Sequence, residues 1–345
     1  ASAPPDRARA SFLSAPLLQS VLTVKTELLS ADAPDAARRA VALLAAGELV
    51  GIPTETVYGL AADATDGAAV ARIFEAKGRP RFNPLICHVP DLAMAATLAE
   101  IGPVAAVLAE AFWPGPLTMV LALKEGSPVH PLATAGLATV AIRAPQGIAG
   151  RLAAALGRPL AAPSANPSGR VSPTNANQVL RGLGGRLPLI LDGGPCEVGV
   201  ESTIVMPEAD RLVLLRAGGV GRAELARATG LPVVDPAGDA AINAPGQLTS
   251  HYAPAGRVRL DATEVVPGEY LVAFGPAPVA GQDQAAAIVN LSPSGDLREA
   301  AAGLFAALAG FDAPEITAIA VAPIPHAGLG EAINDRLRRA AAPRG

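Results

Sequence analysis

The sequence contains few of the residues that build disulfide frameworks, zinc sites and membrane spans. It has only two cysteines, Cys87 and Cys196, which stand far apart and outside any C-x-x-C pair, so neither a disulfide framework nor a zinc site is indicated. The four histidines have no partners at metal-ligand spacing. No uncharged apolar run reaches the roughly 18 residues that a membrane-spanning helix needs. We therefore expect a reducing, cytoplasmic compartment, no membrane association and no metal site built from side chains.

Motifs for phosphate loops, dinucleotide folds and covalent catalysis are also missing. The chain has no G-x-x-x-x-G-K-[ST] loop, no G-x-G-x-x-G after a strand and no G-x-S-x-G elbow. Aromatic residues make up 3% of the chain and its formal net charge is -4, which argues against a protein that coats nucleic acid. The cations and hydroxyl groups that remain suit phosphoryl or nucleotidyl transfer, in which the protein positions reactants and neutralises charge.

The segment Lys77–His88, called the cationic segment below, gathers positive charge. Lys77, Arg79 and Arg81 stand at alternate positions, and two prolines favour an extended path. Alternate side chains of an extended segment point the same way, so we predict that the three cations converge on one anion. The apolar run at 85–89 then predicts a strand that anchors the segment. The alternative is a solvated basic turn.

Other stretches place polar groups where a predicted strand meets a turn. The loop Thr54–Gly59 is either a binding loop or a surface turn. Arg143 ends a short predicted strand, and its partner is either an anionic ligand or a structural carboxylate. The stretch Ser164–Gly169 is either an anion-binding turn or an ordinary loop. A hydroxyl pair begins the predicted strand 200–205, and Arg216 ends another strand at a glycine turn.

Apolar periodicity predicts an α/β chain. Helices are expected at 34–46 and 67–76 among short strands, and the C-terminal part alternates strands and helices in an order that predicts a small parallel sheet without chemistry of its own. A Pro- and Gly-rich stretch at about 235–257 contains His251 and Tyr252, so we expect it to pack against the site. The predicted division is a poorly ordered tail over 1–24, a catalytic domain over 25–228, a linker over 229–256 and a C-terminal domain over 257–345.

Five motifs occur in an order that resembles a known family. They are Pro53-Thr-Glu-Thr-Val-Tyr-Gly-Leu, Lys77-Gly-Arg-Pro with Asn83-Pro-Leu, Pro163-Ser-Ala-Asn-Pro-Ser-Gly, Glu201-Ser-Thr-Ile-Val and Leu215-Arg-Ala-Gly-Gly. Together they are similar to the L-threonylcarbamoyladenylate synthases, the YrdC-like family. His251-Tyr-Ala-Pro and Glu331-Ala-Ile-Asn-Asp-Arg resemble its longer, two-domain branch. The resemblance implies a twisted mixed-sheet domain with a large concave site, a smaller Rossmann-like C-terminal domain, and a linker that lies across the site.

The resemblance also implies an ATP-dependent nucleotidyltransferase. Members of the family make threonylcarbamoyl-AMP and pyrophosphate from L-threonine, bicarbonate or CO₂, and ATP, with Mg²⁺ accompanying the ATP. Their product serves the threonylcarbamoyl modification of adenosine 37 in tRNA. The implied partners of this chain are therefore these substrates and the tRNA threonylcarbamoyl transferase complex that receives the product. We expect a monomer without tight binding to nucleic acid.

Residue roles follow from the same resemblance. Lys77 and Arg79 would be the catalytic cations that hold the triphosphate, and Tyr252 would close the site against water. A guanidinium suits the carboxylate of threonine because it can bind bidentately. No general base is evident, and Arg81 departs from the family pattern and receives no role. The implied ATP contacts are Lys77, Arg79, Asn83, Thr139, Ser164, Asn166, Arg216 and Tyr252, and the implied threonine contacts are Thr56, His88, Arg143, Ser202 and Thr203.

Two other functions compete with this interpretation. An RNA-binding module would use the basic concave surface to grip a phosphate backbone, which requires a broad basic surface and gives steep salt dependence. A carbamoyl-transfer enzyme of hydrogenase maturation shares the domain, but it also needs an acylphosphatase-like segment and zinc-type cysteine pairs. The acidic balance disfavours the first function, and the absence of those segments disfavours the second.

Overall fold

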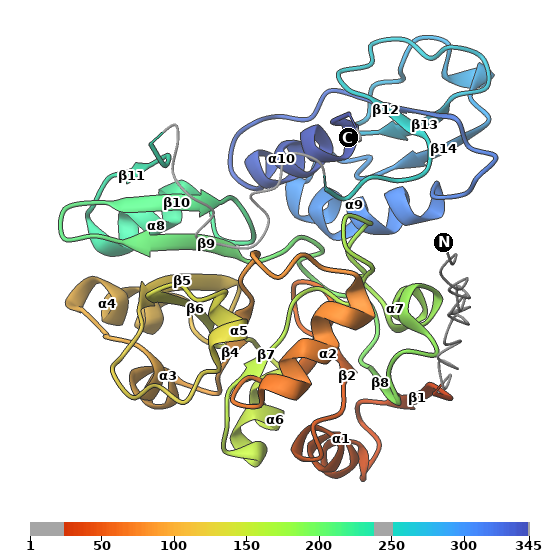
Figure 1. Ribbon diagram of the computed structural model, residues 1–345. Helices are drawn as coiled ribbons and strands as arrows, with labels where there is room; N and C mark the ends of the chain where they lie inside the picture. The colour runs from red at the N-terminus through yellow and green to blue at the C-terminus, as the bar shows by residue number, and fades with distance from the viewer. Residues whose placement is uncertain (1–23, 238–250, 344–345) are drawn as a thin grey trace, which may run out of the picture.

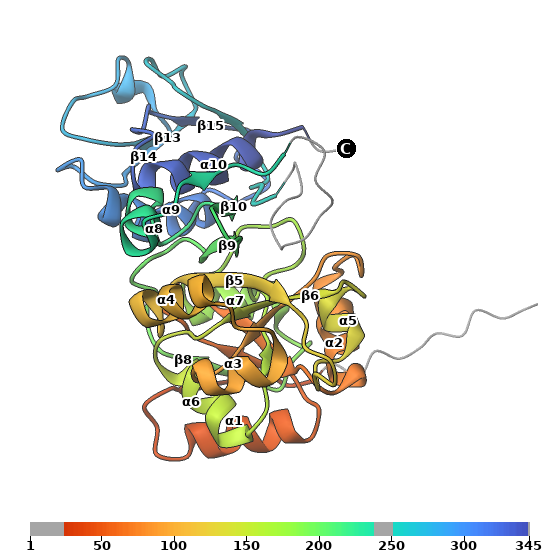
Figure 2. The same ribbon diagram turned by 90° about the vertical axis from the view of Figure 1, so that its left-hand side faces the viewer.

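Two α/β domains make up the protein, which we describe from a computed structural model (Figure 1). The structure describes residues 24–237 and 251–343. The smaller, C-terminal domain lies against one side of the larger domain in both views (Figure 1, Figure 2). The predicted tail, apart from residue 24, and the middle of the predicted linker lie outside the described residues.

One mixed sheet of 11 strands forms the larger domain. Its strands are β1 (Glu27–Ser30), β2 (Val50–Ile52), β3 (Gly59–Asp63), β4 (Ile86–His88), β5 (Leu117–Ala122), β6 (Thr139–Arg143), β7 (Leu160–Ala161), β8 (Leu189–Asp192), β9 (Thr203–Pro207), β10 (Leu212–Arg216) and β11 (Val233–Val234). Their order across the sheet is β1-β8-β2-β3-β7-β4-β6-β5-β9-β10-β11. Because β4 pairs parallel with β6 and β6 pairs antiparallel with β5, the predicted mixed sheet is confirmed.

Helices cover both faces of this sheet. On β3, Leu60 and Ala62 face one core while Ala61 faces the other, as the alternation of side chains along a strand requires. The predicted helices at 34–46 and 67–76 are confirmed as α1 and α2. The helices are α1 (Ala36–Ala45), α2 (Gly67–Lys77), α3 (Leu92–Leu98), α4 (Pro103–Phe112), α5 (Pro131–Thr134), α6 (Ile148–Leu156), α7 (Ala176–Leu183) and α8 (Arg222–Thr229).

The cationic segment is not extended, so the prediction that its three cations converge is wrong. Lys77 is the last residue of α2, and Gly78 ends that helix with a φ of 61° in the left-handed region. This turn breaks the alternation on which the prediction depended. Lys77 and Arg79 are buried, whereas Arg81 is exposed to solvent. The predicted anchoring strand is confirmed as β4.

Strand β9 begins later than predicted. The expected strand covers 200–205, but the strand starts at Thr203, whose backbone N–H donates to the carbonyl of Pro116 in a 3.0 Å bond. Residues 200–202 therefore lie before the strand. The side chains of Glu201 and Ser202 do not have to point to opposite faces of the sheet, as neighbouring side chains in a strand do. Strand β11 pairs with β10, so this sheet continues past the predicted domain boundary at 228.

The smaller domain contains four parallel strands, which confirms the predicted parallel sheet. Its elements are β12 (Arg257–Arg259), β13 (Tyr270–Ala273), the 3₁₀ helix η1 (Gln282–Gln284), β14 (Ala287–Asn290), α9 (Leu297–Gly310), β15 (Ala318–Val321) and α10 (Leu329–Ala341). The strand order is β12-β15-β13-β14. Helices α9 and α10 lie on the side of this sheet that faces the larger domain (Figure 1, Figure 2).

A shared hydrophobic cluster joins the two domains. Leu304 and Phe305 of α9 pack in one buried cluster with Val57 and Val200 of the larger domain and with Tyr252. The interface between the domains is therefore formed by buried apolar side chains next to the loops that carry Thr56 and Glu201. No helix in the described ranges is long and apolar enough to cross a membrane.

Candidate active site

A pocket of about 560 Å³, counting the open space at its mouth, lies where loops of the larger domain meet His251 and Tyr252 of the predicted linker. Most of its polar lining groups come from the ends of β4, β6 and β10 and from the loops that precede β3 and β9. The lining residues are Thr54, Thr56, Val57, Gly59, Arg79, Ile86, His88, Arg143, Ala162, Pro163, Ser164, Glu201, Ser202, Arg216, His251 and Tyr252.

Two guanidinium groups face this pocket without a carboxylate partner among the described residues. Arg79 donates to the carbonyls of Asn83 and Pro84, and Arg216 donates to the carbonyl of Ser202 at 2.9 and 3.1 Å. Burial, followed by repulsion from Arg216, lowers the pKa of Arg79 to about 10, which still leaves it charged at neutral pH. The two buried cations repel each other when the site is empty. A bound anion offsets this repulsion, so the pair favours anion binding.

Lys77 lies behind the pocket rather than in its lining. Its Nζ donates to the carbonyls of Ser164 and Asn166 and so fixes the loop that brings Ser164 to the pocket. Burial, followed by repulsion from Arg79, lowers the pKa of Lys77 well below its ordinary value.

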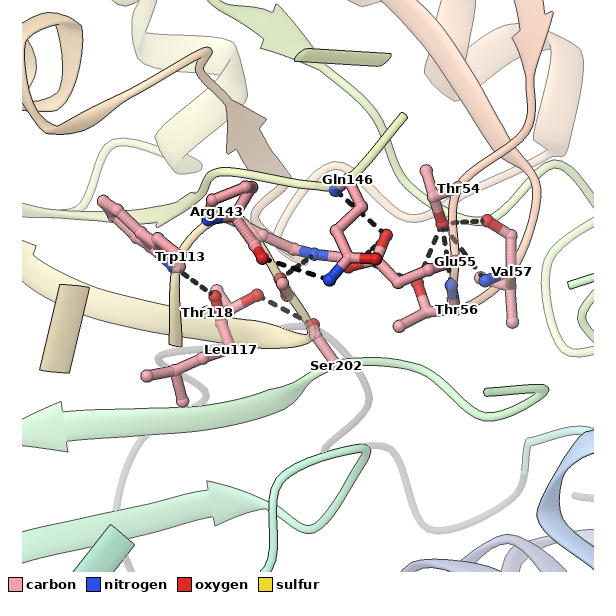
Figure 3. A network of polar contacts seen from close by, with 12 residues as sticks. Thr54, Glu55, Thr56, Val57, Trp113, Leu117, Thr118, Arg143, Gln146 and Ser202 are labelled. Carbon is pink, nitrogen blue, oxygen red and sulfur yellow. Dashed lines mark hydrogen bonds and ion pairs between the residues drawn. The ribbon is translucent and has the colours of Figure 1, made fainter. Parts of the chain in front are cut away.

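A second cluster surrounds Arg143 (Figure 3). Its Nη2 lies 2.7 Å from Oε2 of Glu55, its Nη1 donates to Oγ1 of Thr56 at 2.8 Å, and its Nε donates to the carbonyl of Gly115 at 3.1 Å. Thr54 Oγ1 contacts Thr56 Oγ1 at 2.9 Å and fixes this loop. Of the two partners left open by the sequence, the structure shows a structural carboxylate, Glu55, and it also places Arg143 in the pocket lining.

His88 and Tyr252 also line the pocket. Burial, followed by the nearby charge of Arg143, lowers the pKa of His88 well below its ordinary value, so the imidazole is neutral at neutral pH. Tyr252 is almost fully buried, and burial raises the pKa of its hydroxyl to about 12. Its ring lies 5.3 Å from that of Phe305 and 4.1 Å from that of His251, measured between centroids.

Several predicted contact residues do not line this pocket. Thr139 lies at the opposite end of β6 from Arg143 and faces a separate hollow beside Met206. The hydroxyl of Thr203 donates to the carbonyl of Val220. The others that lie outside the lining are Lys77, Asn83 and Asn166, whereas Thr56, Arg79, His88, Arg143, Ser164, Ser202, Arg216 and Tyr252 are brought together in it.

The structure adds four residues that received no predicted role. Glu55 lies beside Arg143, and Glu201 lines the pocket and accepts a 2.7 Å bond from the hydroxyl of Ser172. Arg336, on α10, donates to Glu201 at 2.8 Å, so a residue of the C-terminal part contacts a carboxylate of the pocket lining. The two carboxylates stand within recognised motifs and were available to sequence reasoning. Arg336 ends the motif Glu331-Ala-Ile-Asn-Asp-Arg but received no role there, and Ser172 lies outside the recognised motifs.

The residues at this pocket do not fit a resident metal ion. Among the described residues, no group of three His, Cys, Asp or Glu side chains lies close enough to hold one. Both carboxylates at the pocket face guanidinium groups, Glu55 that of Arg143 and Glu201 that of Arg336. Mg²⁺ is usually bound through substrate phosphates and only one or two carboxylates.

Comparisons with known proteins agree with this geometry. A family model described as telomere recombination (Sua5, YciO and YrdC) matches residues 42–218, and one described as threonylcarbamoyl-AMP synthase, C-terminal domain, matches 220–342. The threonylcarbamoyl-AMP synthase of Bacillus subtilis is 39% identical over 333 residues, covering 92% of this chain and 95% of the relative. That of Pyrococcus abyssi is 40% identical over 325 residues, covering 88% of this chain and 93% of the relative.

A solved structure extends the likeness to both domains together. The crystal structure of P. abyssi Sua5 complexed with L-threonine superposes with a TM-score of 0.80 at 37% identity, covering 92% of this chain and 97% of that one. The family, the fold class and the enzyme class expected from the sequence are thereby confirmed. The chain belongs to the Sua5-type threonylcarbamoyl-AMP synthases, nucleotidyltransferases in which a YrdC-like domain is followed by a Sua5 C-terminal domain.

Proposed function

We propose that this chain converts L-threonine, bicarbonate or CO₂, and ATP to threonylcarbamoyl-AMP and pyrophosphate. The reaction would take place in the pocket at the ends of β4, β6 and β10. The observation that carries the proposal is the pair of buried guanidinium groups, Arg79 and Arg216, beside the Arg143 cluster. An anionic nucleotide and an amino acid need such adjoining sites. The L-threonine complex of the P. abyssi relative supports the choice of amino acid.

The nucleotide phosphates would bind Arg79 and Arg216. Both are buried, and no carboxylate in the described part of the chain forms an ion pair with either of them. A dianionic or more highly charged group placed between them removes their mutual repulsion. Lys77 supports this side by holding the loop at Ser164, and Tyr252 would cover the bound nucleotide.

The amino acid would bind at the Arg143 cluster. The guanidinium has five N–H groups, and three described contacts leave capacity for the carboxylate of threonine. Thr56, His88 and Ser202 lie around the same space and supply groups for the amine and the side-chain hydroxyl.

The proposed reaction has two bond-forming steps. The threonine amine attacks the carbon of CO₂ and loses a proton, which gives a carbamate. A carbamate oxygen then attacks the α-phosphorus of ATP, and the bond to the β-phosphate oxygen breaks, so that pyrophosphate leaves with its electron pair. Because carbamate and triphosphate are both anionic, the cations of the pocket hold them within reach, and Tyr252 limits access of water to the mixed anhydride.

The product would pass to the tRNA threonylcarbamoyl transferase complex in the cytoplasm, and Mg²⁺ would enter with ATP. The test is release of pyrophosphate from ATP and bicarbonate in the presence of L-threonine, L-serine or no amino acid. We expect turnover that depends on threonine. Equal pyrophosphate release without an amino acid would contradict the proposed specificity.

A further inference from the structure

The wall of the pocket at Glu201 is completed from the C-terminal domain. Arg336, on α10, has an exposed fraction of 0%. Its Nε donates to Oε2 of Glu201 at 2.8 Å, and its Nη1 donates to the carbonyl of Ala217 at 2.9 Å and to Asp335 at 2.8 Å. Its guanidinium carbon lies 5.5 Å from the ring centroid of Tyr252, within the range of a cation–π contact. One buried side chain thus contacts two pocket-lining residues.

Glu201 is a negative group that lines the same pocket as Arg79 and Arg216. Burial alone would raise the pKa of this carboxyl, but Arg336 first and Arg216 second lower it to about 2. The carboxylate is therefore ionised at neutral pH, forms an ion pair with Arg336 and feels the charge of Arg216 at longer range. If Arg336 were absent, the uncompensated buried charge would attract Arg216 more strongly. Arg216 would then be drawn away from any anion in the pocket.

We propose that Arg336 is a positioning residue for the synthesis of threonylcarbamoyl-AMP. It neutralises Glu201, so that Arg216 stays available to the phosphates of the nucleotide, and it holds the ring of Tyr252 at the pocket. The inference rests on the proposed function, because it assigns Arg216 to the nucleotide. It also gives the C-terminal domain a direct part in the site.

A purely structural role for Arg336, as a contact between domains, makes a different prediction. Another ion pair between the domains joins Arg222, on α8, to Glu331 on α10, with a distance of 2.8 Å and side chains about one-third exposed. Glu331 does not line the pocket. Glu331→Gln is therefore a matched control on the same helix, because it removes a domain contact and leaves Glu201 neutralised.

The experiment compares Arg336→Met, Arg336→Lys, Glu201→Gln and the double variant Arg336→Met/Glu201→Gln with the wild-type chain and Glu331→Gln. Pyrophosphate release is measured against ATP concentration at saturating threonine and bicarbonate, and ATP affinity is measured separately by calorimetry. We expect Arg336→Met to lower kcat/KM for ATP on the order of 10²-fold, as displaced catalytic groups do. Glu331→Gln should stay within about 5-fold of the wild type, because exposed ion pairs contribute little.

Rescue of activity in the double variant distinguishes a positioning role of Arg336 from a purely structural one. The double variant removes both buried charges, so it should exceed Arg336→Met in kcat/KM by about 10-fold or more, which a double-mutant cycle reports as coupling between contacting residues. Arg336→Lys, which keeps a positive charge, should also exceed Arg336→Met. If Arg336→Met does not fold, kcat/KM for ATP is compared between Arg336→Lys, the double variant and Glu331→Gln. A positioning role then predicts that Arg336→Lys falls below Glu331→Gln, and a purely structural role predicts that the two are equal.

Two outcomes would overturn the inference: kinetics of Arg336→Met equal to those of Glu331→Gln, or a folded double variant that binds ATP no better than Arg336→Met. Failure of the wild-type chain to release pyrophosphate with threonine would instead contradict the proposed function. In that case, ATP affinity in the same variants would still test whether Arg336 keeps Arg216 available.

Discussion

Arg143 is the residue to which we assign the carboxylate of threonine. Its contacts to Glu55, Thr56 and Gly115 hold the guanidinium in one orientation, so a ligand carboxylate meets a group that needs little reorganisation. Such preorganisation is the physical basis for the predictions at this scale.

Replacing Arg143 by Ala should impair the use of threonine rather than that of ATP. The change removes the proposed carboxylate partner and leaves Glu55 as a buried charge without its cation, so we expect kcat/KM for threonine to fall on the order of 10²–10³-fold. Pyrophosphate release measured over a range of threonine concentrations tests this. Arg151→Ala, at an exposed position of α6, is the control. An unchanged threonine dependence in Arg143→Ala would refute the assignment.

Two buried histidines should make the fold sensitive to mild acid. The pKa of His251 is lowered to about 3, mainly by burial, and that of His88 is lowered well below its ordinary value for the same first reason. Between these values and the unfolded value of about 6.5, the unfolded chain binds more protons, so stability is complete above about pH 6.5 and is lost as the pH falls. Each histidine should contribute about 1.4 kcal/mol per pH unit to this loss.

Urea denaturation at pH 7, 6 and 5 measures this slope. His88→Gln should retain only the part that comes from His251, which is about half. Glu201 does not interfere, because its pKa of about 2 places its own window below pH 4.5. A free energy of unfolding that stayed constant from pH 7 to 5 would show that the two imidazoles are not buried in neutral form.

At the scale of elements, the turn after β10 approaches the start of β9 so closely that only glycine fits at Gly218. A Cβ at this position would meet the backbone of Glu201, Ser202 and Thr203 well inside van der Waals contact. The backbone of Glu201 and Ser202 is therefore held in place by its close contact with the turn that follows β10.

Gly218→Ala should push this backbone away and cost about 1–3 kcal/mol of stability by overpacking. It should also raise KM for ATP, because Arg216 donates to the carbonyl of Ser202. Thermal unfolding and ATP-dependent pyrophosphate release measure the two effects. Gly310→Ala is the matched control, since nothing lies within 4 Å of its Cβ position and it ends a helix. Equal behaviour of the two variants would contradict the close approach.

The elements themselves could largely be predicted from the sequence, and the exceptions have local causes. Apolar periodicity located β4 and β10, because their residues are buried in the sheet. The cationic segment was predicted to be extended on the strength of its prolines, but Gly78 ends α2 in the left-handed region and turns the chain first. The start of β9 is set by where Thr203 pairs with β5, including its backbone bond to Pro116, and no pattern near Thr203 indicates this register.

At the scale of the whole molecule, the site depends on contacts between residues far apart in the chain. The motifs around Arg79, Arg143 and Arg216 could be predicted to meet because the resemblance supplied their common fold. The contact of Arg336 with Glu201 could not be predicted, although Arg336 ends a recognised motif, because the partner of this buried cation is set by how α10 docks on the larger domain. Arg336 lies 135 positions from Glu201, and no local pattern records that distance.

Docking of the domains can be tested at Gly199, in the larger domain. A Cβ there would meet the backbone of Ala301 and Ala302 on α9, and its φ of 72° is itself unfavourable for alanine. Gly199→Ala should therefore separate the two domains locally, lower the melting temperature and reduce pyrophosphate release. Calorimetry should show a broader transition or two transitions. Gly230→Ala, which has a φ of 71° but open space around it, controls for backbone strain alone.

The position of Arg336 has a consequence for how the protein is made. Ribosomes deliver the chain from the N-terminus, so Arg79, Arg143 and Arg216 emerge and can fold well before α10. Until that helix docks, the newborn larger domain holds Glu201 without its counter-charge, next to the guanidinium proposed for the nucleotide. A nascent or prematurely terminated chain would thus carry every phosphate-facing cation and still handle ATP poorly, which would keep incomplete copies from consuming it.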